Sequence, residues 1–131
     1  MIVLLDTQII LWALIDETKL TAHEKKILTS TDHQIYCHPI SFFEISLKYA
    51  IGKLELAGCT PDEIPKLMED NGYLIATGDA RVMSSVHQLP MEKHRDPFDR
   101  LLVWHAIQND LHLLSIDRQM PIYEKHGLKL I

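Results

Sequence analysis

The chain has 131 residues, of which 47% are hydrophobic and 24% are charged, a length and composition that predict one globular domain with one core. The formal net charge of −5 argues against a protein that coats nucleic acid through a basic surface, but it does not exclude a nuclease, because bound divalent metal would reverse the local charge. No apolar stretch is long enough to cross a bilayer and the N-terminus lacks a signal-peptide pattern, so we expect a cytoplasmic protein without membrane contact.

Short apolar runs alternate with helical patterns along the chain. In chain order, these patterns predict a strand at residues 1–5, helices at 9–14 and 21–30, a strand at 35–37, helices at 39–52 and 61–71, a strand at 73–75, helices at 79–86 and 99–109, and strands at 111–115 and 128–131. Capping boxes at Thr21–Glu24 and Thr60–Glu63 mark two helix starts. Gly52 and Gly72 suit the positions just past two helix ends.

The resulting β-α-α-β-α-α-β-α-α-β-α-β order predicts an α/β fold, a three-layer sandwich in which a central parallel sheet carries helices on both faces. In such sheets, ligands bind beyond the carboxyl ends of the strands. Asp6 and Asp117 directly follow two of the apolar runs, so we expect both side chains at that edge. The pattern does not predict the order of the strands within the sheet.

Four acidic residues stand in otherwise apolar neighbourhoods: Asp6, Glu44, Asp99 and Asp117. A carboxylate beside buried hydrophobic groups is costly unless it is paired or bound to a metal. Four such residues in one small domain suggest a shared cation. Because carboxylate oxygens favour hard ions, the pattern indicates a Mg²⁺ or Mn²⁺ site and metal-assisted chemistry on a phosphate.

Each of these carboxylates also has an ordinary structural explanation. Asp6 could cap the helix that follows it, although Thr7 could do so instead and leave Asp6 free. Glu44 could form a surface ion pair with Lys48 four residues on, but its apolar neighbours leave little exposed helix there. Asp117 could be a turn residue, yet it repeats the strand-end position of Asp6.

The segment Asp96-Pro97-Phe98-Asp99 reads as a helix start, with Asp96 as N-cap, Pro97 as the first helical residue and Asp99 as the favoured acidic residue of the first turn. This explanation covers both aspartates, so the helix start cannot separate their roles. Both should project near the same sheet edge, where one could orient the other or a metal-bound water.

The basic residues and His94 near these carboxylates allow two interpretations each. Lys48, Lys53, Arg95 and Arg100 could contact phosphates or lie on a solvated face. His94 could act as a base or bind phosphate, or it could be a solvated loop residue. We expect His105 on a different helix face from Asp99.

Together these positions resemble the PIN-domain ribonucleases and, within them, the toxins of VapBC-type toxin–antitoxin pairs. The matching segments occur in order along the whole chain and are Leu4–Thr7, Glu44–Leu54, His94–Leu102, Leu114–Asp117 and Gly127–Ile131. His94–Leu102, which contains the sequence DPFDR, is the most specific. Gln8, Phe43 and Ile116 depart from the residues common in the family, but none of them removes a carboxylate.

The resemblance implies that residues 1–131 form a single PIN domain with a PIN-like sandwich fold. It implies an endoribonuclease that hydrolyses RNA phosphodiester bonds with Mg²⁺ or Mn²⁺, in which one or two ions activate a water and no covalent intermediate forms. The implied catalytic residues are Asp6, Glu44, Asp99 and Asp117, and Asp96 joins them as a metal ligand. It further implies a cognate antitoxin that inserts a basic or apolar segment near the acidic pocket, and a homodimer.

Two other functions fit parts of the sequence. A catalytically idle PIN-like binding module would keep the fold without turnover. A phosphatase with an aspartate nucleophile would also place Asp6 at the end of the first strand, but Gln8 stands where such an enzyme needs a second aspartate, and no glycine-rich phosphate loop is present.

Overall fold

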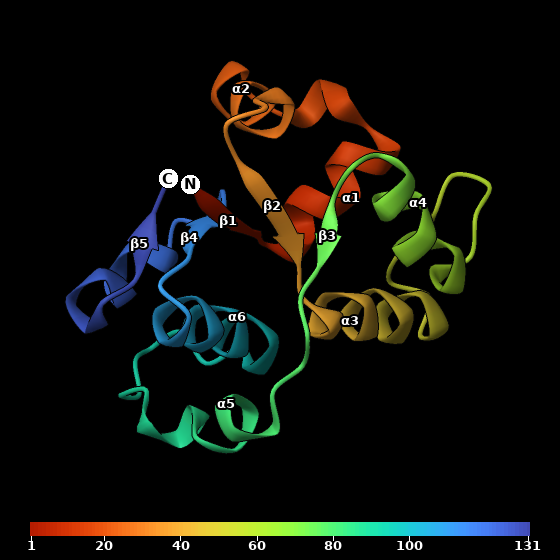
Figure 1. Ribbon diagram of the computed structural model, residues 1–131. Coiled ribbons are helices and arrows are strands. Elements are labelled where there is room, and N and C mark those ends of the chain that lie inside the picture. The colour runs from red at the N-terminus through yellow and green to blue at the C-terminus, as the bar shows by residue number, and fades with distance from the viewer.

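The computed structural model describes all residues, Met1–Ile131, and its centre is a five-stranded parallel sheet (Figure 1). The strands, in the spatial order β3-β2-β1-β4-β5, are β3 (Leu74–Ile75), β2 (Gln34–Cys37), β1 (Ile2–Leu5), β4 (His112–Leu114) and β5 (Lys129–Leu130). All four neighbouring pairs are parallel. The first strand of the chain is therefore central, as its wholly apolar sequence predicts.

The helices cover both faces of this sheet, which confirms the predicted three-layer α/β fold. They are α1 (Thr7–Ile15), α2 (Ala22–Thr29), α3 (Pro39–Ala50), α4 (Ile64–Asp70), α5 (Ala80–Ser84) and α6 (Pro97–Gln108), with 3₁₀ helices at Glu17–Lys19, Pro61–Glu63, Val86–Gln88 and Met120–His126. The helix that the alternation implies before the last strand is the 3₁₀ helix Met120–His126. None of the helices has the length and apolar content needed to cross a membrane.

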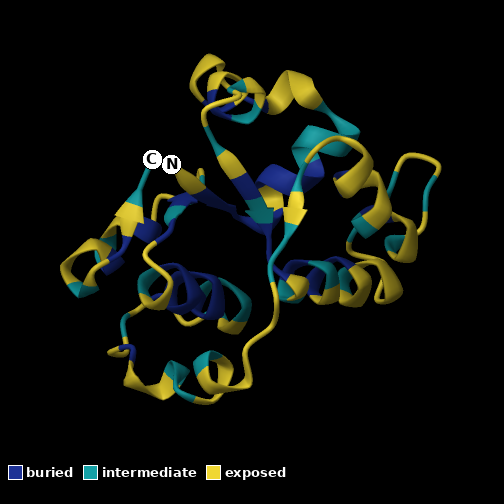
Figure 2. Cartoon of the chain, viewed as in Figure 1, coloured by how far each residue is buried: buried dark blue, intermediate teal, exposed yellow.

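Two hydrophobic cores lie on opposite faces of the sheet because successive side chains of β1 alternate between the faces. Val3 and Leu5 pack with residues of α1, α2, α3 and α4, whereas Leu4 packs with residues of α6 and the 3₁₀ helix Met120–His126. Figure 2 shows β1 and α6 as largely buried elements, in contrast to the exposed outer surface of α5. The carboxyl edge of the sheet lies between the two cores.

The helix ends contain the glycine stops and the capping interactions that the sequence predicts, with one exception. Gly52 and Gly72 adopt left-handed backbone conformations with φ of 76° and 90° directly after the C-cap residues of α3 and α4, as predicted for helix stops. The Glu63 carboxylate closes the predicted box by accepting from the Thr60 N–H at 3.3 Å. At the other predicted box, Thr21 Oγ1 accepts from the Glu24 N–H at 3.4 Å, but no return bond reaches the Glu24 carboxylate.

Candidate metal centre

Asp6 and Asp117 meet because they follow neighbouring strands. The Asp6 N–H donates to the Leu114 carbonyl at 3.0 Å, which extends the pairing of β1 and β4 by one residue. The Ser115 hydroxyl then joins the two acidic residues: it donates to Asp6 Oδ2 at 2.5 Å and accepts from the Asp117 N–H at 3.0 Å. Sequence reasoning gave Ser115 no role, although a serine directly after a strand and two residues before an aspartate suits such a turn.

Asp6 itself is the N-cap of α1, and the expectation that Thr7 could take this place is wrong. Asp6 Oδ1 accepts from the Thr7 N–H at 2.7 Å. The Thr7 hydroxyl instead donates to Ser41 Oγ at 2.9 Å, which ties α1 to α3. Capping and metal binding are compatible for Asp6, because each carboxylate oxygen accepts one hydrogen bond and keeps further lone-pair capacity.

Asp96 and Asp99 occupy different places at the start of α6. Asp96 is the N-cap, and its Oδ1 accepts from the N–H groups of Phe98 and Asp99 at 2.9 and 3.0 Å, as the sequence predicts. Asp99 Oδ2 is 3.0 Å from Nε2 of His94. The structure thus distinguishes a capping carboxylate from one that is held by a histidine, a distinction the helix start alone did not provide.

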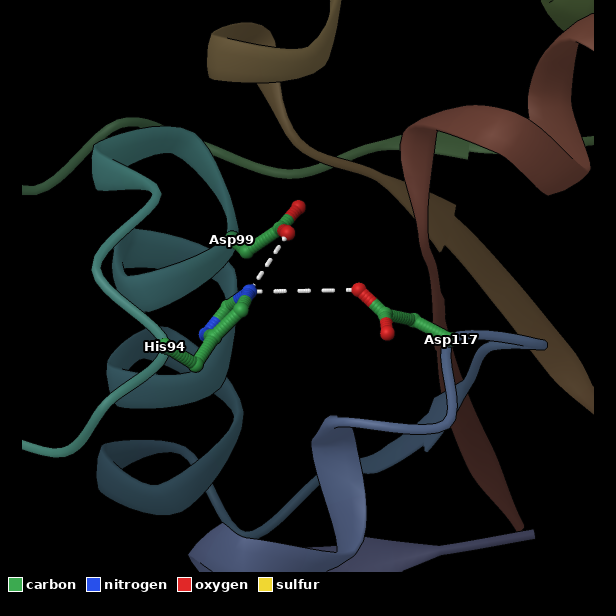
Figure 3. Close-up of side chains that lie close together, drawn as sticks. All are labelled: His94, Asp99 and Asp117. Carbon is green, nitrogen blue, oxygen red and sulfur yellow. Dashed lines mark hydrogen bonds and ion pairs between the residues drawn. The ribbon is translucent and has the colours of Figure 1, made fainter.

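His94 is buried, with 6% of its surface exposed, so its interpretation as a solvated loop residue is wrong. Its Nε2 lies 3.0 Å from Asp99 Oδ2 and 3.8 Å from Asp117 Oδ2. Figure 3 shows these two contacts as dashed lines. On its other side, Nδ1 lies 2.7 Å from the Tyr123 hydroxyl. His94 therefore connects the two carboxylates to a buried polar network that includes a tyrosine from the far end of the chain.

Glu44 comes from α3 and is 4% exposed. Its Oε2 accepts from Lys48 Nζ at 2.5 Å, so the predicted pair exists, but Glu44 is its buried member. Its Oε1 has no hydrogen-bond partner. One half-exposed lysine therefore leaves part of a buried carboxylate unsatisfied, which is a cost that a bound cation would remove.

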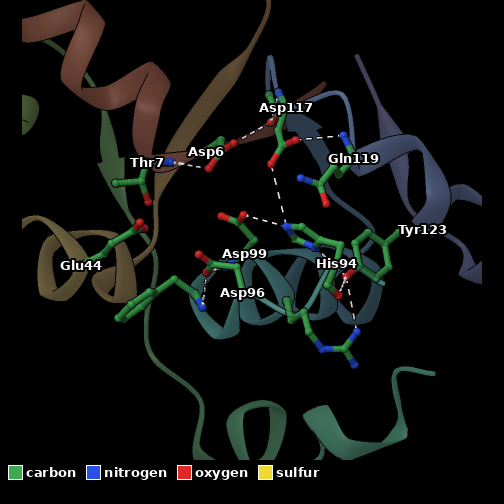
Figure 4. A network of polar contacts seen from close by, with 12 residues as sticks. Asp6, Thr7, Glu44, His94, Asp96, Asp99, Asp117, Gln119 and Tyr123 are labelled. Carbon is green, nitrogen blue, oxygen red and sulfur yellow. Dashed lines mark hydrogen bonds and ion pairs between the residues drawn. The ribbon is translucent and has the colours of Figure 1, made fainter. Parts of the chain in front are cut away.

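All five predicted acidic residues line one cavity of about 300 Å³ at the carboxyl edge of the sheet (Figure 4). They come from the ends of β1 and β4, from the body of α3 and from the start of α6. The other lining residues are Thr7, Gln8, Leu11, Ile45, Lys48, Leu54 and Ile116. Carboxylates separated by up to 111 positions in the sequence thus converge as predicted, and Lys48 is the one basic residue among the lining side chains.

The carboxylates raise one another's pKa. Burial and the charges of Asp6 and Asp96 raise the pKa of Asp99 from 3.8 to about 7, against the opposing hydrogen bond from His94. Burial also raises the pKa of Asp6, and the hydrogen bonds from Ser115 and Thr7 oppose that shift. Without a cation the cluster is therefore self-repelling, and the contact between Asp99 and His94 needs one proton between its two atoms.

Two further residues of α6, Arg100 and His105, were considered in the sequence. Arg100 is buried and donates to the Leu89 carbonyl at 2.8 Å and the Pro90 carbonyl at 3.3 Å, so it supports the loop before α6 and its interpretation as a phosphate ligand is wrong. His105 lies on a different face of α6 from Asp99, as expected, and its ring packs edge-on against His38 with centroids 4.5 Å apart.

The donor set fits a hard divalent cation. It consists of carboxylate oxygens at the mouth of a parallel sheet, with one buried oxygen, Glu44 Oε1, that no protein group satisfies. Asp6, Glu44, Asp99 and Asp117 could provide the ligands, and Asp96 could contribute the oxygen that does not cap α6. The fold and this cavity define an α/β protein with a candidate cation site.

The sequence matches the PIN domain family over residues 3–125, and the chain belongs to this family. This confirms the resemblance drawn from the ordered acidic segments. No curated protein sequence matches the chain closely enough to be assigned as a relative.

The fold is similar to that of several solved toxin–antitoxin proteins. The match to VapBC2 from Rickettsia felis spans 100% of this chain and 98% of the VapBC2 chain, with 18% identity and a TM-score of 0.64. VapBC2 was solved bound to a DNA fragment from its promoter. The match to VapBC-1 from nontypeable Haemophilus influenzae spans 100% of this chain and 97% of the VapBC-1 chain, with 13% identity and a TM-score of 0.64. The match to FitAcB from Neisseria gonorrhoeae spans 98% of this chain and 96% of the FitAcB chain, with 17% identity and a TM-score of 0.60.

Proposed function

We propose that the chain is a metal-dependent endoribonuclease that acts as the toxin of a toxin–antitoxin pair, and that residues 1–131 form one PIN domain. The observation that carries the proposal is the convergence of five carboxylates in one cavity, among them a buried glutamate with an unsatisfied oxygen. Family membership supports nuclease chemistry, and the similar toxin–antitoxin structures support the biological setting. An RNA substrate and a protein antitoxin would both be met in the cytoplasm.

The proposed catalytic residues are Asp6, Glu44, Asp99 and Asp117, and these with Asp96 would hold Mg²⁺ or Mn²⁺. A bound divalent cation would supply Lewis acidity for hydrolysis of a phosphodiester bond. The remaining groups position this set: Ser115 holds Asp6, the start of α6 holds Asp96, and Lys48 partly neutralises Glu44. No side chain in the cavity needs to act as a covalent nucleophile.

Exposed basic side chains beside the cavity suit a polyanionic substrate. The Lys48 side chain is 45% exposed and lines the cavity, and Lys53 and Arg95 are exposed next to lining residues. These cations would contact the RNA backbone, while the carboxylates would contact it only through a cation. This arrangement reconciles a nucleic-acid substrate with the net charge of −5.

An apolar stripe along α3 and its C-cap residue suits the antitoxin. Phe43, Leu47 and Ile51 lie at successive i, i+4 spacings and are 58%, 41% and 56% exposed. They flank the cavity-lining residues Glu44 and Lys48, so a partner seated on the stripe would cover the acidic cavity. The similar VapBC and FitAcB structures are complexes with antitoxins, which supports an antitoxin partner for this chain. The homodimer expected from the resemblance stays a prediction, which light scattering would test.

The test is cleavage of a mixed RNA pool by the pure protein in Mg²⁺, Mn²⁺ or EDTA. Asp6→Asn is the key variant, because asparagine also caps helices well and should leave α1 intact. Asp62→Asn, at an exposed position away from the cavity, is the matched control. We expect discrete fragments that need metal, persist in Asp62→Asn and vanish in Asp6→Asn. Metal binding without any cleavage would instead favour the idle binding module.

A further inference from the structure

A nitrogen donor outside the acidic set lies beside Asp99 and Asp117, two of the residues that line the cavity. His94 Nε2, Asp99 Oδ2 and Asp117 Oδ2 belong to a group of ligand atoms that all lie within 4.8 Å of one another (Figure 3). Two of the distances, from Nε2 to the aspartate oxygens, are 3.0 and 3.8 Å. Adjacent ligands of an octahedral ion with bonds near 2.1 Å are about 3 Å apart, so these three atoms could share one ion after small movements.

The hydrogen bonds of Tyr123 determine which nitrogen of His94 is available. The Tyr123 hydroxyl donates its proton to the His94 carbonyl at 3.0 Å. It can therefore only accept at its other contacts, from His94 Nδ1 at 2.7 Å and from Arg100 Nη1 at 3.4 Å. Nδ1 consequently carries a hydrogen, and the Nε2 lone pair is the one that can face the carboxylates once the shared proton is lost.

This support resembles the way proteins orient metal-binding histidines, whose second nitrogen donates to an oxygen that fixes the ring. The ring is held firmly, because His94, Tyr123 and Arg100 are 6%, 0% and 7% exposed. Arg100 is itself anchored by the Leu89 carbonyl at 2.8 Å. The network therefore holds Nε2 towards Asp99 and Asp117 and leaves the ring no freedom to turn away.

The geometry points to His94 as a nitrogen ligand of the cation, alongside Asp99 and Asp117, with Tyr123 as its positioning residue. This inference rests on the proposed cation site but goes beyond its carboxylate set. A nitrogen donor changes the expected ion, because Mg²⁺ favours oxygen ligands, whereas first-row divalent transition ions also accept imidazole. The site should therefore favour ions such as Mn²⁺ over Mg²⁺.

Electron spin-echo spectroscopy of the Mn²⁺-loaded protein tests this directly, since a coordinated imidazole gives a ¹⁴N coupling to the Mn²⁺ signal. We expect that coupling in the wild type and in His23→Gln, which changes an exposed histidine. It should be absent from His94→Asn, because asparagine can replace Nδ1 as a donor to Tyr123 but offers nothing at Nε2. Calorimetry should show Mn²⁺ affinity roughly tenfold or more lower in His94→Asn, with Mg²⁺ affinity changed much less.

Tyr123→Phe provides a milder variant in case His94→Asn does not fold. It removes the acceptor for Nδ1 and should weaken Mn²⁺ binding by about tenfold while keeping Mg²⁺ binding. Mn²⁺ binding without ¹⁴N coupling in the wild type would overturn the role of His94, even if metal-dependent RNA cleavage stands. Failure of the protein to bind any divalent cation would overturn both this inference and the proposed site.

Discussion

Glu24 and Glu44 are alike in burial and in having one carboxylate oxygen without a partner, yet only one of them belongs to the candidate site. Each lies on a helix, each is 4% exposed, and each has an Oε1 atom without a hydrogen-bond partner. Glu24 has no cationic partner and does not line the acidic cavity, whereas Glu44 pairs with Lys48 and faces the carboxylates of the strand ends. A buried, unsatisfied carboxylate is thus not a metal site by itself.

The difference between the two glutamates comes from the sheet. α3 passes the carboxyl edge, where β1 and β4 deliver Asp6 and Asp117 and where α6 begins with Asp96 and Asp99. α2 contributes to a core on one face of the sheet and meets no such edge. Function therefore depends on how many charged groups the topology gathers, and less on the burial of any one of them.

The largest expected effect separates the two glutamates directly. Glu44→Gln removes a charge from the proposed cation site and should lower RNA cleavage by on the order of 10²-fold. Glu24→Gln is the matched control, with the same chemical change at the same burial, and should retain cleavage within about twofold. Initial cleavage rates of both variants, with circular dichroism to verify folding, provide the measurement. Equal losses in two folded variants would refute the distinction.

A smaller loss is expected when a residue that positions the cluster is changed. Ser115→Ala removes the donor to Asp6 Oδ2 and the acceptor for the Asp117 N–H, and should lower cleavage by about tenfold. Ser115→Thr keeps the hydroxyl and should recover most of the rate. Ser84→Ala, at an exposed position, serves as the control. If Ser115→Ala cleaves like the control, the serine does not position the site.

The smallest effect concerns the stability of the metal-free protein. The pKa of Asp99 is raised to about 7, so the native state holds its proton more tightly than the unfolded state, whose value is near 3.8. The stability from this group is therefore present at low pH and is lost as the pH rises towards about 7. Asp99→Asn cannot ionise and should escape that loss.

In EDTA at pH 8, we expect Asp99→Asn to be about 1 kcal/mol more stable than the wild type, a value reduced for solvent screening. The advantage should shrink at pH 5, where the native Asp99 keeps its proton. Denaturant unfolding at both pH values measures this difference in unfolding free energy. The contributions of the other titrating groups largely cancel between the two proteins. An advantage that is equal at both pH values, or absent at pH 8, would contradict the self-repelling cluster.

Much of this architecture could be predicted because residues close together in the sequence determine where its strands and helices begin and end. The apolar run ending at Asp6, the helix start Asp96–Asp99 and the left-handed glycines after α3 and α4 each report short-range physics, and all three are found as expected. Parallel topology then brings strand ends to one edge, which is why acidic residues far apart in sequence could be grouped in advance.

The parts that could not be predicted depend on tertiary contacts. The burial of His94 and Arg100 follows from Tyr123, which lies 29 and 23 residues further along the chain in a 3₁₀ helix without a clear pattern. The N-cap of α1 had two candidate residues; Asp6 takes that place with an extended backbone, and the Thr7 hydroxyl bonds Ser41, which lies 34 residues further along the chain. Strand order likewise has no local signature.

The most direct test of the central claim is a calorimetric titration of Mn²⁺ into the metal-free wild type, Asp6→Asn and Glu24→Gln. The account predicts saturable binding to the wild type, the same binding to Glu24→Gln, and binding to Asp6→Asn that is lost or weakened by at least about tenfold. Wild-type protein that takes up no Mn²⁺, or Asp6→Asn that binds it as tightly as the wild type, would contradict the claim that this cavity is a cation site.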